Sequence, residues 1–172
     1  MDLEKLGRDI VDASYLRGDF VLSSGARSPF YFDKYLFETR PSILRRIASG
    51  LARLLPSDTD RIAGPELGAV ALAAALSLAV DLPFVIVKRE AKSYGTARLV
   101  EGDLHRGDRV VVVEDVITTG AQAIHAARQV AFAGANVLTI LAVVDREEEG
   151  SRRIAEAGYS FQSLFRLSQL GL

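Results

Sequence analysis

Residues 110–123 read VVVVEDVITTGAQA, a run of four valines that meets two acids and then a turn rich in hydroxyl groups. Such a valine run is typical of a strand buried on both faces, as in a parallel sheet between layers of helices. Glu114 and Asp115 stand at the expected end of this strand, where an unpaired carboxylate would be too costly to desolvate. The two acids therefore need partners, and the candidates are a metal, a cation or the hydroxyl groups of a ligand.

The turn that follows, Thr118-Thr119-Gly120, leads into a predicted helix. Backbone N–H groups and the dipole at a helix N-terminus attract phosphate, and a glycine lets a ligand approach the backbone closely. The stretch thus offers a phosphate cradle beside an acidic pair, which suits a ribose 5-phosphate unit. A solvated strand end followed by a plain helix cap would explain the same residues in an isolated strand–helix unit.

Strands and helices alternate along the rest of the chain, which predicts an α/β fold with a mostly parallel sheet. Helices are expected over about residues 1–15, 41–55, 67–80 and 121–134, and strands over residues 61–64, 83–89, 109–115, 136–146 and 159–165, with short strands around a turn within 20–37. Ligands of such sheets bind at the carboxyl ends of the strands. This rule selects residues 64–68, 88–96 and 114–122.

Composition narrows the function classes. The chain has 172 residues, 21 Lys plus Arg against 22 Asp plus Glu, and no cysteine, which excludes disulfides and thiolate sites and gives no general attraction to nucleic acid. No signal peptide or membrane span is expected, so we interpret the chain as cytoplasmic. His105 and His125 lack metal-ligand spacing and are assigned to the surface or to packing. Neither a P-loop nor a G-x-G-x-x-G motif is present.

The valine run, acid pair and Thr-Thr-Gly turn together resemble the phosphoribosyl pyrophosphate (PRPP) motif of type I phosphoribosyltransferases. Three further segments, FVLSSGARSPFYFD (20–33), KREAKSYGT (88–96) and VVDREEEG (143–150), are similar to the orotate phosphoribosyltransferase family. The likeness runs in order from about residue 19 to residue 150. It implies a type I phosphoribosyltransferase fold in a single domain, 1–172, with a small N-terminal hood within 1–40 and a PRPP-binding core within 60–150.

The resemblance also implies an activity. The family transfers the ribose 5-phosphate of PRPP to orotate, which gives orotidine 5'-monophosphate and pyrophosphate in pyrimidine (UMP) biosynthesis. Mg²⁺ would be held mainly through PRPP or pyrophosphate, so no residue is assigned as a metal ligand. A homodimer is implied, in which residues 88–96 reach the neighbouring active site.

Residue roles follow from the same resemblance. PRPP binding is expected of Lys88, Arg89, Lys92, Tyr94, Glu114, Asp115, Val116, Ile117, Thr118, Thr119, Gly120, Ala121 and Gln122. Three of these are expected to be catalytic: Glu114 and Asp115 favour a cationic ribose C1, and Lys92 stabilises the departing pyrophosphate. A solvated basic loop is the alternative for the three cations of residues 88–96.

The base is expected to bind beside Thr118 and Arg146, because the arginine fork suits a flat, acidic pyrimidine. A surface pair of Arg146 with residues 147–149 is the alternative. Residues 63–70 match a loop whose backbone amides contact pyrophosphate. Residues 30–33 would line the base pocket, or else fill the core with aromatic side chains.

Four positions depart from the family pattern. Gln122 replaces a small hydroxyl residue, Ser23 a lysine and Tyr94 a histidine, and Lys88-Arg89 reverses the frequent order. These changes bear on affinity more than on the reaction class. Two other functions stay open on the sequence: a transferase for another nucleobase, and a PRPP-sensing regulator that binds nucleic acid.

Overall fold

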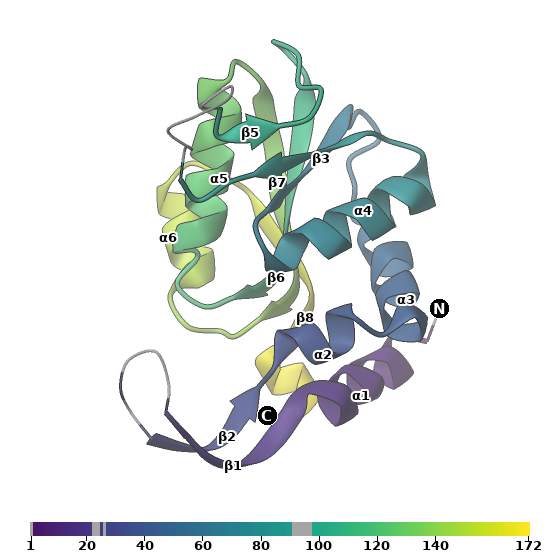
Figure 1. Ribbon diagram of the computed structural model, residues 1–172, viewed down its shortest axis with the longest axis vertical. Coiled ribbons are helices and arrows are strands. Elements are labelled where there is room, and N and C mark those ends of the chain that lie inside the picture. Colours follow the sequence, from purple (N-terminus) through teal and green to yellow (C-terminus); the bar gives the residue numbers. More distant parts are fainter. Residues whose placement is uncertain (1, 22–24, 26, 91–97) are drawn as a thin grey trace.

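A twisted sheet runs through the middle of the molecule, with strand order β5-β4-β3-β6-β7-β8 (Figure 1). The computed structural model describes residues 2–21, 25, 27–90 and 98–172. The strands of the sheet are β3 (Arg61–Pro65), β4 (Phe84–Val87), β5 (Val100–Glu101), β6 (Arg109–Ile117), β7 (Asn136–Asp145) and β8 (Phe161–Arg166). Neighbouring strands are parallel except β4 and β5, which are antiparallel. The predicted mostly parallel sheet is therefore confirmed.

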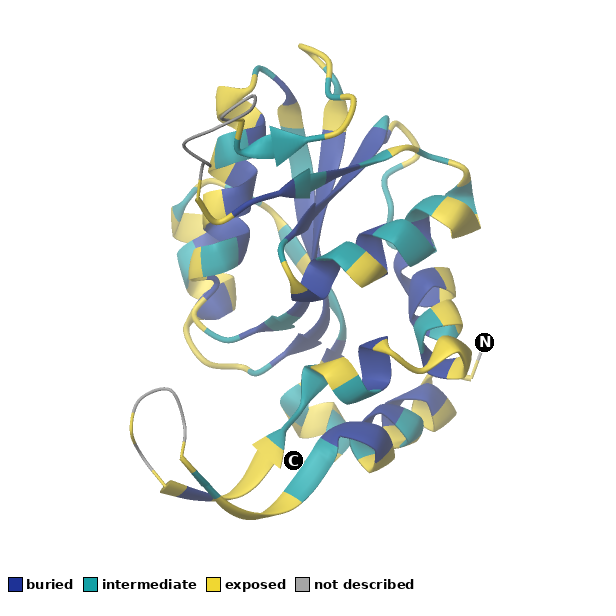
Figure 2. Ribbon diagram, viewed as in Figure 1, coloured by how far each residue is buried: buried dark blue, intermediate teal, exposed yellow. Residues whose placement is uncertain are grey.

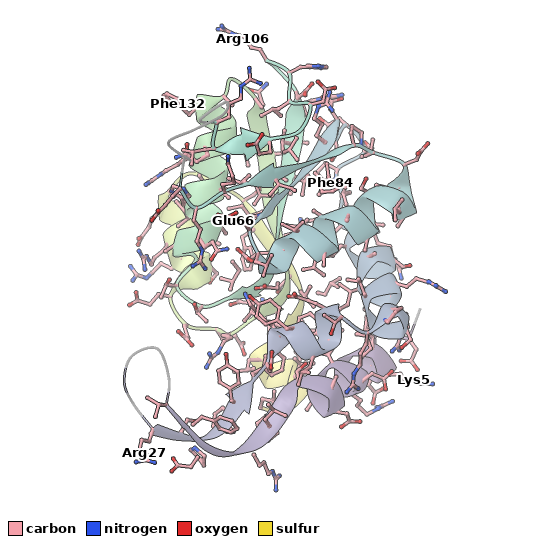
Figure 3. The ribbon with its side chains drawn as sticks, viewed as in Figure 1. Lys5, Arg27, Glu66, Phe84, Arg106 and Phe132 are labelled. Atoms are coloured by element: carbon pink, nitrogen blue, oxygen red, sulfur yellow. The ribbon has the colours of Figure 1, made fainter. Side chains whose placement is uncertain are left out.

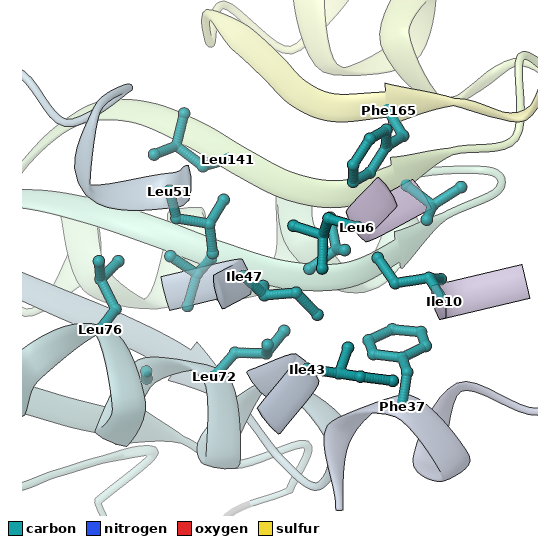
Figure 4. Close-up of a cluster of buried hydrophobic side chains, with 14 of the residues drawn as sticks. Leu6, Ile10, Phe37, Ile43, Ile47, Leu51, Leu72, Leu76, Leu141 and Phe165 are labelled. Atoms are coloured by element: carbon teal, nitrogen blue, oxygen red, sulfur yellow. The ribbon is translucent and has the colours of Figure 1, made fainter. Parts of the chain in front are cut away.

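Helices cover both faces of this sheet (Figure 1). The flanking helices are α3 (Pro41–Ala52), α4 (Gly68–Val80), α5 (Ala121–Phe132) and α6 (Gly150–Glu156). Val111 and Val113 of β6 pack in one buried cluster with α3 and α4, which Figure 4 shows, whereas Val110 and Val112 pack in a second cluster with α5 and α6. Alternate side chains of a strand point to opposite faces of the sheet, and helices cover both faces. All four valines are therefore fully buried.

A small hood lies beyond one end of the sheet (Figure 1). It consists of α1 (Leu3–Ser14), the antiparallel hairpin β1 (Tyr15–Val21) and β2 (Arg27–Phe32), and α2 (Lys34–Glu38), and the short 3-10 helix η1 (Leu167–Leu170) lies beside α1. Leu6 and Ile10 of α1 are fully buried and join the first cluster, so the hood shares the core of the sheet (Figure 4). Much of the described hairpin is exposed (Figure 2).

Four elements differ from the sequence-based expectation. Strand β6 continues past the two acids to Ile117, so Glu114 and Asp115 lie within the strand and not at its end. Residues 34–38 form a helix, because the Asp33 side chain accepts a hydrogen bond from the backbone N–H of Tyr35 at 3.1 Å and caps it. Strand β5 and helix α6 are too short to give a periodic pattern. None of the helices in the described ranges combines the length and apolar character needed to cross a membrane.

Candidate active site

Asp115 finds its partner within the chain. Its carboxylate is only 1% exposed, and Oδ2 lies 2.6 Å from Nζ of Lys34, the first residue of α2. Burial lowers the pKa of Lys34, but the charge of Asp115 and its hydrogen bond outweigh burial and raise that pKa above its ordinary value. One of the three kinds of partner expected for the acid pair, a cation, is therefore present for Asp115, and it comes from the hood.

Two more buried carboxyl groups, those of Glu114 and Glu38, lie near Asp115. Glu114 is 3% exposed, and burial, followed by the charge of Asp115, raises its pKa well above the ordinary range. Glu38 of α2 is also 3% exposed, and burial together with the charge of Asp115 raises its pKa to about 9. With its pKa raised in this way, Glu38 keeps its proton at neutral pH and can donate it toward the Asp115 carboxylate. The site is thus an acid cluster with one lysine and one protonated glutamate.

The backbone packs closely around this cluster at Gly68, the first residue of α4. A Cβ atom at Gly68 would lie 1.9 Å from Oδ2 of Asp115 and 3.0 Å from Nζ of Lys34. Only a glycine therefore allows the start of α4 to approach the ion pair. Strand β6, helix α2 and the start of α4 meet at this one point.

The turn after β6 has the form expected of a phosphate cradle. Gly120 is the N-cap of α5 with a φ of 72°, a conformation that favours glycine. The N–H groups of the first turn of a helix have no carbonyl partner within the helix, so they are available to an anion. A Cβ at Gly120 would lie 3.1 Å from the backbone oxygen of Gly150, which shows how tightly α6 packs behind the turn.

Gln122 joins this turn to two neighbouring segments. Its side-chain Nε2 donates to the backbone oxygen of Glu66 at 3.0 Å, and its Oε1 accepts from Nη2 of Arg89 at 3.0 Å. The carboxylate of Glu66 in turn accepts from the backbone N–H of Arg89 at 2.8 Å. Glu66, near the middle of the molecule in Figure 3, follows β3, and Arg89 follows β4. Three carboxyl ends of strands are thus held together.

Lys88 lies in a different environment from the exposed cation expected at that position. It is buried, and its Nζ lies 2.6 Å from Oε1 of Glu101 on β5. Its backbone N–H donates to the oxygen of Leu99 at 2.8 Å. The Lys88 side chain therefore ties the end of β4 to β5, whereas Arg89 is exposed.

Arg146 is placed at the carboxyl end of β7, next to the phosphate turn. Its backbone N–H donates to the oxygen of Ile117 at 2.9 Å, which brings it beside Thr118. Its half-buried guanidinium lies 3.3 Å from Oε1 of Glu148. The two residues expected to hold orotate are therefore adjacent, and the surface pair named as the alternative is also present.

Comparison with known proteins now decides the family. Residues 38–161 match the family model of the phosphoribosyl transferase domain. The orotate phosphoribosyltransferase of Methanocella arvoryzae is 44% identical over 153 residues, which cover 89% of this chain and 87% of that protein. That of Archaeoglobus fulgidus is 50% identical over 154 residues, which cover 89% and 82%. The chain belongs to the orotate phosphoribosyltransferase family.

A solved structure of the orotate phosphoribosyltransferase family has the same fold. The Mycobacterium tuberculosis enzyme, crystallised in complex with PRPP, aligns with a TM-score of 0.86 at 29% identity over 100% of both chains. The predicted α/β type I phosphoribosyltransferase fold with its N-terminal hood is therefore confirmed.

Two residues expected to bind PRPP, Lys92 and Tyr94, lie outside the described residues, as does Ser23, which departs from the family pattern. Phe30 stacks on Tyr15 with ring centroids 5.5 Å apart and stays 41% exposed, so it does not fill the core. Of the aromatic residues within 30–33, Phe32 packs against the first cluster.

Both histidines lie where packing or surface roles were assigned. The His105 side chain is mostly exposed and bonds Arg61 and Asp103, and His125 is exposed on α5. The sequence did not identify Lys34 or Glu38 as site residues. Asp33 is a good N-cap, and residues 34 and 38 share one helix face, so this spacing was the available signal.

Proposed function

We propose that this chain transfers the ribose 5-phosphate of PRPP to orotate, giving orotidine 5'-monophosphate and pyrophosphate for pyrimidine nucleotide biosynthesis. The observation that carries this is the position of Glu114 and Asp115, buried in β6, with Asp115 five residues before Gly120, the N-cap of α5. A ligand with ribose hydroxyl groups and a 5-phosphate spans these two features. Membership of the orotate phosphoribosyltransferase family supports orotate as the acceptor.

PRPP would bind along the carboxyl ends of the strands. The backbone from Thr118 to Gln122 would bind the 5-phosphate, and Glu114 and Asp115 would accept from the ribose hydroxyl groups. Val116 and Ile117 supply the strand between these two contacts. Toward the other end of the ligand, the pyrophosphate would contact the segment after β3 and the cations Lys88, Arg89 and Lys92, with Tyr94 nearby.

The reaction breaks the bond between ribose C1 and pyrophosphate oxygen, and the electron pair leaves on pyrophosphate. A ring nitrogen of orotate supplies the pair that forms the new bond to C1. The buried acids favour positive charge on the ribose, and Lys92 favours the leaving anion. Thr118 and Arg146 would hold orotate, and its acidic ring nitrogen needs no strong general base.

Mg²⁺ fits the site as an ion carried by its substrate. The described residues contain no group of three or more side chains able to hold a metal, so pyrophosphate and ribose oxygens would supply most ligands. When bound, the ion offsets negative charge on the leaving group.

We further propose a single domain over residues 1–172, with the hood within 1–40 and the PRPP-binding core within 60–150. The chain would act in the cytoplasm as a homodimer, with residues 88–96 reaching the neighbouring active site. Sedimentation of the purified protein at micromolar concentration tests the dimer, and a monomer that keeps full activity would contradict it.

The decisive experiment follows orotate absorbance in the presence of PRPP and Mg²⁺. Orotate should disappear only when both are supplied, with one pyrophosphate released for each orotate consumed. Uracil, hypoxanthine and xanthine are tested as competing acceptors. Faster consumption of any of these bases than of orotate would reassign the acceptor while retaining the transfer.

A further inference from the structure

We propose that Lys34 and Glu38 of α2 are positioning residues of the ribose site, which hold Asp115 in place and reduce its negative charge before PRPP binds. This inference rests on the proposed function, because it assigns Asp115 to the ribose hydroxyl groups. It adds two residues from the hood to a site otherwise built from the strand ends.

The contacts place both side chains on the same carboxylate. Lys34 Nζ lies 2.6 Å from Asp115 Oδ2, and Glu38 is buried close enough to Asp115 for the charge of Asp115 to raise the pKa of Glu38. Residues four apart on a helix face the same way, so one face of α2 presents both groups to β6. Helix α2 lies next to the start of α4 and the lower end of β6 in Figure 1.

The backbone at Gly68 packs against the contact between Asp115 and Lys34. Its α-carbon leaves space for the ion pair, since a Cβ there would lie within 3.0 Å of both Asp115 Oδ2 and Lys34 Nζ. Asp115 is therefore confined by backbone on one side and by two α2 side chains on another. Its carboxylate is presented in one orientation, as a binding site for hydroxyl groups requires.

The charge of the cluster is the second reason to assign Lys34 and Glu38 to the ribose site. Ionised Glu38, Glu114 and Asp115 would place three negative charges together, in a buried region that must receive a ligand with a phosphate and a diphosphate. The cation of Lys34 and the proton of Glu38 together make the formal charge of the cluster less negative by two. Without them, repulsion between the acids and the ligand would act at short range in a medium that screens poorly. Lys34 therefore supports PRPP binding and does not compete with it.

The test compares Lys34→Met with Lys34→Arg in the purified full-length protein. Lys34→Met should raise KM for PRPP roughly tenfold or more, with a much smaller change in kcat and in KM for orotate. Lys34→Arg should recover most of this loss, because it restores a cation. Lys5→Met removes an exposed lysine of α1, at the edge of the molecule in Figure 3, and serves as the matched control.

The role of Glu38 is tested by the same comparison of KM for PRPP with kcat and with KM for orotate. Glu38→Leu, which has no polar group for Asp115, should raise KM for PRPP more than Glu38→Gln, whose amide donates a hydrogen bond in place of the proton. Thermal unfolding of every variant shows whether it remains folded. If Lys34→Met does not fold, Lys34→Arg and the two Glu38 variants still decide the question.

The outcomes separate the two proposals. Absence of PRPP-dependent orotate consumption in the unsubstituted protein would refute the proposed function itself. An active unsubstituted protein whose folded Lys34→Met variant has an unchanged or lower KM for PRPP would overturn only the role of Lys34. Equal KM values for Glu38→Leu and Glu38→Gln would overturn the role of Glu38.

Discussion

The side-chain amide of Gln122 donates to the backbone oxygen of Glu66 at 3.0 Å, across 56 residues of sequence. The amide oxygen of Gln122 accepts from the guanidinium of Arg89, and the backbone N–H of Arg89 donates to the Glu66 carboxylate. The three residues come from the segments after β6, β3 and β4. The resemblance places Gln122 where a small hydroxyl residue is frequent, and its longer side chain connects the turn after β6 with the segments after β3 and β4.

Replacement of Gln122 by leucine should weaken PRPP binding. The change removes two side-chain hydrogen bonds, one to the backbone oxygen of Glu66 and one from the charged guanidinium of Arg89. At about 1 kcal/mol each they total about 2 kcal/mol, so an increase in Kd of up to about thirtyfold is expected. Calorimetric titration of PRPP with Mg²⁺ measures it. Gln129→Leu, on the same helix but outside this network, should leave Kd unaltered. Equal Kd values for the two variants would show that the network does not organise the site.

Lys88 and Glu101 should be energetically coupled. Their side chains lie 2.6 Å apart, with Lys88 buried and Glu101 partly exposed. Lys88→Met, Glu101→Gln and the double variant form a cycle in which we expect a coupling of about 1 kcal/mol in the free energy of unfolding. Urea denaturation provides the values. Strict additivity would mean that the pair does not stabilise the base of the loop.

The same variants address PRPP binding. If Lys88 also contacts pyrophosphate, as the resemblance implies, Lys88→Met should raise KM for PRPP and Glu101→Gln should not raise it. Equal increases in both variants would assign Lys88 to holding β4 and β5 together. Initial rates at saturating orotate distinguish these results.

Lys92→Ala should reduce turnover while the protein stays folded. Lys92 lies outside the described residues, so this prediction rests on the family resemblance alone. Loss of one charge aimed at a leaving anion costs about 10²–10³ in kcat at comparable sites. Single-turnover rates and far-ultraviolet circular dichroism test both parts. A kcat near that of Lys5→Ala, an exposed lysine variant, would remove Lys92 from the mechanism.

The sequence predicted the centre of the fold well, because its signals are local. The four valines of β6 and the glycine at position 120 each report their own burial or backbone conformation. Glu114 and Asp115 were recognised as a pair that needs partners. Their partner was missed because Lys34 lies 81 residues away from Asp115, in a segment whose aromatic residues predicted a strand.

Side-chain networks were also beyond the sequence. Gln122 was treated as the loss of a hydroxyl donor, since nothing local indicates that its amide reaches Glu66. The sequence groups Lys88 with Arg89 as a cation that binds PRPP or lies in a solvated loop, whereas Lys88 is buried next to the antiparallel strand β5. That strand is two residues long, too short for any periodic signal. These contacts depend on how helices and strands that are distant in the sequence pack together, and a single sequence does not reveal that packing.

The buried proton of Glu38 should make stability fall as pH rises. Its pKa is raised from 4.5 to about 9 by burial and by Asp115, so between these values the folded state binds one more proton than the unfolded state. The free energy of unfolding therefore decreases with increasing pH, by at most about 1.4 kcal/mol per pH unit from this group. Glu114, whose pKa is also raised, acts in the same direction.

Glu38→Gln isolates this contribution, because its amide cannot titrate. Relative to the unsubstituted protein, the variant should gain stability steadily as pH rises from 5 to 8.5, measured by urea denaturation at each pH. Glu156→Gln is the matched control, since Glu156 is exposed and pairs with Arg152 on the surface of α6. Parallel curves for Glu38→Gln and the unsubstituted protein would mean that Glu38 is ionised in the folded state. Glu38 would then add its own negative charge beside Asp115, and Lys34 would be the cation left to offset the charge of the acids.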